Sequence, residues 1–114
     1  MAYTAIDDPS AHFQAKVYTG NGTTNTAYTN DGNSDLQPDF LWFKGRDSSI
    51  SHYLSDTSRG IETIFWSDST GAEYDYSSYD TVTAVGSDGF TVGTSTGHNA
   101  DGAGFVCWQW KANG

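Results

Sequence analysis

Histidine, cysteine and carboxylate side chains are the groups of this 114-residue chain that could do acid–base, nucleophilic or metal chemistry. None of the three histidines, His12, His52 and His98, stands in a nucleophile or zinc-binding motif. His98 lies in the glycine-rich segment 97–102, which predicts a solvated loop side chain. Cys107 lies in an apolar run, where a thiol is normally a small buried hydrophobe. We therefore expect no enzyme activity and no catalytic residues.

Oxygen-rich loops could instead bind a cation. Asp31, Asn33 and Asp35 alternate along one loop, so their side-chain oxygens could surround a calcium ion. The loop lacks the spacing and the closing glutamate of an EF-hand. Asx turns, in which these side chains bond their own backbone, explain the same pattern. We favour a solvated loop, keep calcium as an alternative ligand, and predict no other cofactor.

Exposed aromatic side chains could bind a sugar or a protein. Tyr74, Tyr76 and Tyr79 lie in a stretch rich in serine and aspartate, which favours exposure, and Trp66 precedes it. Sugars stack on such rings and bond to neighbouring Asp and Asn side chains. These four residues are our candidate glycan-binding site.

The other aromatic residues with a candidate role lie in two apolar segments. Residues 40–44 carry apolar side chains on both faces, which predicts an inner strand. Trp108 and Trp110 share one face of a closing strand, with Cys107 on the other face. Because aromatic rings dominate small β cores, we favour the core for the tryptophans and keep a subunit interface as the alternative. The residues assigned to core or interface are Phe40, Trp42, Phe43, Trp108 and Trp110.

Strands must position these side chains, because helix-forming patterns are nearly absent. Leucine and glutamate are scarce, and Gly, Ser, Thr, Asn and Asp separate short aromatic and β-branched runs. This pattern predicts an all-β fold, an antiparallel two-sheet β-sandwich or jelly roll of about seven or eight short strands with little or no helix. We expect an N-terminal arm, residues 1–12, and one domain, residues 13–114. The predicted strands cover residues 13–18, 23–28, 40–44, 51–54, 61–66, 81–85, 89–93 and 104–111.

The charge of the chain excludes some partners. Its formal net charge is −9, with only five lysines and arginines, so no basic surface is available for nucleic acid or an anionic membrane. The sequence has no apolar run long enough to cross a bilayer. Residues 1–8 are acidic rather than hydrophobic, which argues against a signal peptide.

Several short motifs follow one another along the chain: residues 18–23 (YTGNGT), 37–44 (QPDFLWFK), 46–47 (RD), 52–56 (HYLSD), 59–60 (RG), 87–93 (SDGFTVG) and 108–111 (WQWK). This ordered set resembles a module of virion structural proteins from tailed phages. The resemblance extends from about residue 13 to residue 114. It implies a β-sandwich of the concanavalin-like or jelly-roll kind and a role in the tail, a fibre or the surface of the particle.

Together these observations predict a non-enzymatic virion surface protein, either a capsid decoration protein or a tail or fibre subunit. It would assemble onto the particle in the host cytoplasm. Its partners would be other virion proteins and further copies of itself, with a trimer expected from the symmetry that the resemblance implies. The alternative is a lectin-like module that attaches to host-surface glycans.

Overall fold

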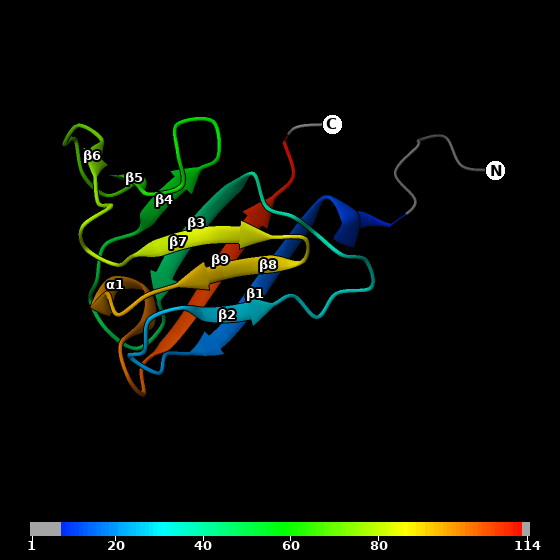
Figure 1. Ribbon diagram of the computed structural model, residues 1–114, viewed down its shortest axis with the longest axis horizontal. Helices are drawn as coiled ribbons and strands as arrows, with labels where there is room; N and C mark the ends of the chain where they lie inside the picture. The colour runs from blue at the N-terminus through cyan, green and yellow to red at the C-terminus, as the bar shows by residue number, and fades with distance from the viewer. Residues whose placement is uncertain (1–7, 113–114) are drawn as a thin grey trace.

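Two antiparallel sheets pack face to face in the computed structural model, which describes residues 8–112 (Figure 1). The larger sheet has six strands in the order β1-β9-β3-β4-β5-β6, and the smaller has the order β2-β8-β7. The predicted all-β sandwich is confirmed. The strands are β1 (Phe13–Thr19), β2 (Thr26–Thr29), β3 (Phe40–Gly45), β4 (Tyr53–Asp56), β5 (Thr63–Trp66), β6 (Tyr74–Asp75), β7 (Val82–Gly86), β8 (Gly89–Val92) and β9 (Gly104–Trp110).

Strand β9 lies between β1 and β3 and shows how alternation builds the core. Phe105, Cys107 and Gln109 face the small sheet and are completely buried. The core between the sheets is aromatic and tightly packed, and the Phe43 and Phe90 ring centroids lie 5.2 Å apart in an edge-to-face arrangement. Its buried members are Tyr18, Leu41, Phe43, Ile64, Val82, Phe90, Val92, Phe105 and Cys107.

Strands β7 and β8 pair as a hairpin, and they cover most of the predicted strands 81–85 and 89–93. Gly89 has φ +146°, a conformation that side chains disfavour. A Cβ at this position would lie 2.1 Å from the backbone oxygen of Tyr28 on β2. Glycine is therefore required both by the turn and by the close approach of the neighbouring strand.

Three short elements depart from the predicted loops. Strand β6 begins in the tyrosine-rich stretch, which raises the number of described strands to nine. Helix α1 (Thr96–Asn99) interrupts the predicted polar loop 94–104, with Ser95 as its N-cap. A 3₁₀ helix, η1 (Pro9–Ala11), lies in the part of the predicted arm that is described, and residues 1–7 lie outside the described residues.

The prediction that His98 is a solvated loop residue is wrong. Helix α1 places its side chain in the interior with no exposed surface. The imidazole packs against the rings of Phe43 and Tyr53, at centroid distances of 4.6 and 4.8 Å. The hydroxyl of Tyr18 donates a hydrogen bond to the His98 backbone oxygen (2.7 Å). Helix α1 is polar in sequence and yet buried, because contacts with distant residues supply hydrogen bonds to its backbone.

Candidate functional site

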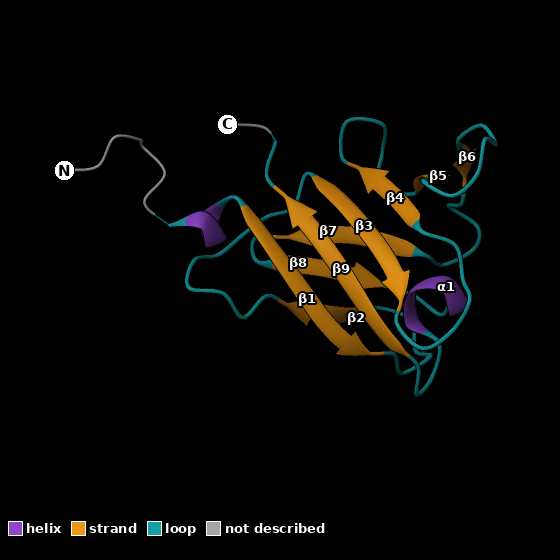
Figure 2. Ribbon diagram, turned by 180° about the vertical axis from the view of Figure 1, so that it is seen from behind, coloured by secondary structure: helices purple, strands orange, loops and turns teal. Residues whose placement is uncertain are grey.

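The six-stranded sheet presents an apolar surface on the side turned away from the small sheet. Strands β1, β9, β3 and β4 lie in front in Figure 2, and no described element crosses them. Strand register brings the outward side chains into rows, because directly paired residues share a face. What we call the outer face consists of Phe13, Ala15, Val17, Phe40, Trp42, Lys44, Leu54, Asp56, Val106, Trp108 and Trp110.

The preferred placement of Trp42, Trp108 and Trp110 in the core is therefore wrong. All three are only partly buried, as is Phe40, whereas Phe43 is completely buried as expected. Both faces of β3 and β9 are apolar, so periodicity alone could not identify the covered face. The small sheet covers the side of Phe43, which leaves the tryptophans outside.

The aromatic rings of the outer face interlock rather than lie flat. The Trp42 and Trp108 rings meet edge to face, with centroids 5.8 Å apart and an interplanar angle of 79°. Phe40 and Trp110 pack similarly at 5.3 Å and 65°, and Phe13 lies 5.0 Å from Trp110. Such packing fixes the rings in place. It also gives the surface relief instead of a coplanar platform.

A shallow hollow of about 260 Å³ lies among these rings, lined by Trp42, His52, Trp108 and Trp110. The indole N–H of Trp42 donates a hydrogen bond to Nδ1 of His52 (2.9 Å). This bond occupies the Trp42 donor and requires an unprotonated Nδ1 on His52. The hollow is consequently an apolar depression with few free polar groups in its lining.

Charge is sparse on this face although the chain is strongly acidic. On β1, β9, β3 and β4 only Lys44 and Asp56 are ionisable residues of the outer face. The Asp56 carboxylate pairs with Nε of Arg59 at 2.9 Å. The Arg59 guanidinium also lies 4.4 Å from the centre of the Phe65 ring, at the β5 end of the face. The outer face is therefore nearly neutral.

The predicted glycan-binding residues do come together, at the far end of the large sheet. Tyr76 is their centre, and its ring lies 5.0 Å from that of Tyr79, 5.1 Å from that of Tyr74 and 5.9 Å from that of Trp66. We call these four residues the tyrosine cluster. Tyr74 and Tyr79 are 54% and 55% exposed. Tyr76 and Trp66 are partly buried and pack against the core. Within residues 8–112 the three phenol hydroxyls have no hydrogen-bond partner, and those of the exposed Tyr74 and Tyr79 are available to a ligand.

Comparison with known proteins gives one family. Residues 8–114 match the model of a family described as a domain of unknown function, DUF7483. The chain belongs to the DUF7483 family. No curated protein and no solved structure matches it.

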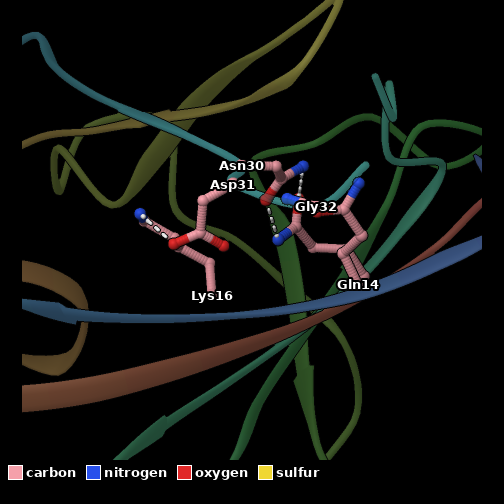
Figure 3. A network of polar contacts seen from close by, with 6 residues as sticks. Gln14, Lys16, Asn30, Asp31 and Gly32 are labelled. Carbon is pink, nitrogen blue, oxygen red and sulfur yellow. Dashed lines mark hydrogen bonds and ion pairs between the residues drawn. The ribbon is translucent and has the colours of Figure 1, made fainter. Parts of the chain in front are cut away.

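The loop predicted to hold calcium is tied to its neighbours in this DUF7483 domain. The Asp31 carboxylate lies 3.4 Å from the Lys16 ammonium (Figure 3), and the Asn33 amide donates to the Asp8 carboxylate (2.9 Å). Hydrogen bonds from Ser10, Ser34 and Asn33 hold the pKa of Asp8 far below its usual value. Asp35 is exposed. Among residues 8–112 no three His, Cys, Asp or Glu side chains gather around a common point where they could hold a metal ion, and calcium stays an untested alternative.

Buried amides, which sequence reasoning missed, hold this loop on the sandwich (Figure 3). Gln109 lies between two outward tryptophans and therefore points inward, where its amide exchanges hydrogen bonds of 2.7 and 3.0 Å with the amide of Asn30. Gln14 accepts a hydrogen bond from the Gly32 backbone N–H (2.9 Å) and donates to the Ser34 backbone oxygen (2.7 Å). The sequence signal that could have revealed Gln109 is its position between Trp108 and Trp110, since alternation along a strand places it on the face opposite to theirs.

The two buried groups with reactive chemistry are shielded from any substrate in solution. Burial lowers the pKa of His98 to about 3, so its imidazole is neutral, and Nε2 has no hydrogen-bond partner in the described part of the chain. Burial raises the pKa of the Cys107 thiol well above its usual value. Cys107 is a free thiol with no exposed surface.

No helix within residues 8–112 is long and apolar enough to span a bilayer.

Proposed function

We propose that this DUF7483 domain is a non-enzymatic structural module of a phage virion surface, which assembles by docking the outer face onto a protein partner. The observation that carries the proposal is the row of partly exposed rings, Phe40, Trp42, Trp108 and Trp110, over which no described element lies. A sheet face of this composition is normally covered by another layer. A partner protein would supply that layer.

The chemistry of the outer face favours a protein over a sugar. Aromatic residues are enriched where protein interfaces are most buried, and charged residues are depleted there. A sugar would need polar groups for its hydroxyls, yet the Trp42 N–H and His52 Nδ1 already bond to each other. The interlocked rings also offer no flat stacking surface.

The virion setting rests on the resemblance of the ordered motifs to structural proteins of tailed phages. The small size and the acidity of the sandwich are compatible with a structural role, and so is the burial of His98 and Cys107. The partners in this setting are other virion proteins and further copies of the chain. Both a capsid decoration protein and a tail or fibre subunit would use such a docking face.

The proposal is tested by incorporation into particles. Tagged wild-type chain should co-sediment with virions from cells that express it during infection by the phage encoding it, and Trp110→Ala should be lost from them. Tyr79→Ala is the matched control, because it removes an exposed ring outside the docking face and should leave incorporation unchanged. Circular dichroism and thermal melting establish that both variants are folded. Wild-type incorporation of folded Trp110→Ala would contradict docking through this face.

A second candidate function, glycan binding for host attachment, is favoured by the tyrosine cluster. Within residues 8–112 its hydroxyls have no hydrogen-bond partner, and Glu73 and Asp75 are exposed beside it, with Glu73 paired to Arg59 at 3.0 Å. Asp75 accepts a hydrogen bond from the Ser77 backbone N–H, which lowers its pKa and keeps it ionised at neutral pH. The ionised Asp75 repels acidic glycans, so neutral sugars are the expected ligands.

A glycan array tests this second function. Wild-type chain should bind neutral glycans, Tyr74→Ala should lose that binding, and Trp110→Ala should keep it. The array is run with and without calcium, which also tests the alternative that the loop of Asp31, Asn33 and Asp35 binds this ion. Absence of binding under both conditions would remove the glycan hypothesis and leave the docking proposal standing.

A further inference from the structure

We infer that the partner protein inserts an arginine side chain into the hollow lined by Trp42, His52, Trp108 and Trp110, so that the outer face docks onto a basic surface. This inference rests on the proposed function, because it names the chemistry of the docking partner. Four observations carry it: the angle between indole rings, the scarcity of free polar groups in the hollow, a carboxylate beside it, and an arginine that already lies over a ring of this face.

The hollow presents indole rings to its occupant. The Trp42 and Trp108 rings lie at 79° to each other with their centroids 5.8 Å apart, so they form a corner rather than a flat platform. Trp110 also lines the hollow. The face of an aromatic ring attracts a cation within about 6 Å, and tryptophan does so most strongly. The hollow of about 260 Å³ is smaller than sites that hold whole small-molecule ligands, and it has room for one side chain.

The polar groups of the hollow distinguish between cations. The Trp42 N–H donates to Nδ1 of His52, so this imidazole is neutral and its acceptor nitrogen is occupied. A lysine ammonium is strongly hydrated and would lose its water here without a replacement. A guanidinium is planar and more weakly hydrated, and it can stack on an indole while its N–H groups stay at the rim. The hollow therefore favours arginine over lysine.

A carboxylate lies beside the hollow. Asp68 accepts a hydrogen bond from the backbone N–H of His52 at 3.3 Å. Asp68 is exposed, and no lysine or arginine of residues 8–112 forms an ion pair with it. A carboxylate accepts strong, charge-assisted hydrogen bonds from the edge of a guanidinium. Asp68 is therefore placed to bind the edge of an arginine whose face lies on a neighbouring ring.

The same face already holds one contact of this kind. The Arg59 guanidinium lies 4.4 Å from the centre of the Phe65 ring, and its Nε is 2.9 Å from the Asp56 carboxylate. Phe65 pairs with Leu54, and Leu54 pairs with Trp42, so Phe65 belongs to the row of outward side chains that includes Trp42. An arginine of the chain itself thus shows the combination of ring and carboxylate that we assign to the hollow.

Charge complementarity makes the partner basic. The chain has a formal charge of −9, so it attracts a basic surface and repels an acidic one. A second copy carries the same charge and is disfavoured as the occupant of this face. Lys44 is the cationic residue that the four strands of the outer face contribute, and its ammonium donates to the backbone oxygens of Gly45 and Ser48. These bonds hold it at the loop after β3, and it does not line the hollow.

Titration of the purified chain with N-acetylarginine amide, followed through the indole N–H signals in NMR spectra, tests the inference. The signals of Trp42, Trp108 and Trp110 should shift with a dissociation constant on the order of millimolar, because one side chain makes few contacts. N-acetylcitrulline amide is the matched control ligand, since it has nearly the same shape without the charge. It should bind at least about fivefold more weakly. The signal of Trp66, in the tyrosine cluster, should not shift.

Two variants locate the binding. Trp108→Leu keeps an apolar side chain but removes one indole, and should raise the dissociation constant about fivefold or more. Asp68→Asn should raise it about twofold to fivefold, and should also lower incorporation into virions. Asp101→Asn is the matched control, because it removes the same charge from an exposed loop outside the hollow and should change neither. Circular dichroism establishes that the variants are folded. If Trp108→Leu does not fold, the exposed Asp68→Asn and the citrulline ligand still decide the result.

The alternative outcomes are distinct. Absence of shifts, equal binding of the citrulline ligand, or an equal shift of the Trp66 signal would overturn the inference. Particle incorporation separates this failure from failure of the proposed function. If arginine does not bind but folded Trp110→Ala is lost from virions, docking through the outer face stands and the arginine contact is rejected. If arginine binds in the hollow but folded Trp110→Ala enters virions normally, the preference of the hollow for arginine stands and its role in docking is rejected.

Discussion

At the scale of single residues, His98 links the fold to pH. Its imidazole is completely buried against Phe43 and Tyr53, and burial lowers its pKa from the ordinary value of 6.5 to about 3. Between these two pH values the unfolded chain binds a proton that the folded chain does not. The stability that follows from a neutral His98 is therefore complete above pH 6.5 and is lost as the pH falls toward 3.

We predict that the free energy of unfolding falls by up to about 1.4 kcal/mol per pH unit within this window. Urea unfolding at a series of pH values measures the slope. His98→Leu should flatten it between pH 6.5 and the range where carboxylates titrate. His12→Leu, a change at an exposed histidine, should keep the wild-type slope. Equal slopes for the two variants would show that another group carries the acid sensitivity.

Gln109 carries a second prediction at this scale. Its side chain is completely buried and its amide is paired with that of Asn30. Gln109→Leu should lower the free energy of unfolding by about 1–3 kcal/mol, because the side-chain oxygen of Asn30 loses its donor in the interior. Gln37→Leu, at an exposed glutamine, should change it by less than about 0.5 kcal/mol. Denaturant titration measures both, and equal effects would refute the role of the amide pair.

At the scale of elements, Gly86 and Gly89 of the β7–β8 hairpin show that a neighbouring strand can decide whether a turn position requires glycine. Gly89 opens β8 with φ +146°, directly against the Tyr28 backbone of β2. Gly86 ends β7 in the same hairpin, but a Cβ there would meet no atom within 4 Å. The two positions differ in conformation and in space, although both are glycines of one turn.

Gly89→Ala should therefore destabilise the domain by about 2 kcal/mol or more, from backbone strain and from the clash with β2. Gly86→Ala should change stability by less than about 0.5 kcal/mol. Thermal melting of the two variants compares them directly. A Gly89→Ala variant as stable as Gly86→Ala would mean that the hairpin can move away from β2 without cost.

At the scale of the whole molecule, Cys107 reports on the integrity of the sandwich. It lies on β9, between β1 and β3, and faces the small sheet, with no exposed surface and a raised pKa. Both sheets must separate before a reagent can reach it.

Its thiol should therefore react with a thiol reagent only at the rate set by opening of the core. Gly89→Ala should speed the reaction, since it lowers the stability of the whole domain, while Tyr79→Ala, an exposed surface change, should not. Mass spectrometry of labelled protein follows the reaction. Rapid labelling of the folded wild-type chain would contradict the buried position of Cys107.

Local patterns in the sequence were sufficient for most elements. Strands 13–18 and 40–44, and the hairpin around residues 87–89, follow from alternation and from turn residues, which act between near neighbours. The helix at residues 96–99 was missed because a run of Ser, Thr, Gly and Asn carries no helical periodicity. It is held by contacts to distant residues, such as the bond from Tyr18 to the His98 backbone.

For the candidate sites too, some features follow from the local sequence and others depend on tertiary packing. Composition alone predicted that Tyr74, Tyr76 and Tyr79 are available on the surface. Tyr74 and Tyr79 are exposed, because little apolar sequence surrounds them, whereas Tyr76 is partly buried against the core. Composition also predicted an all-β chain with few basic groups. It could not predict which side of β3 and β9 is covered, since both sides are apolar. That choice depends on where β2, β7 and β8 pack, and their packing on the side of Phe43 leaves Trp42, Trp108 and Trp110 outside.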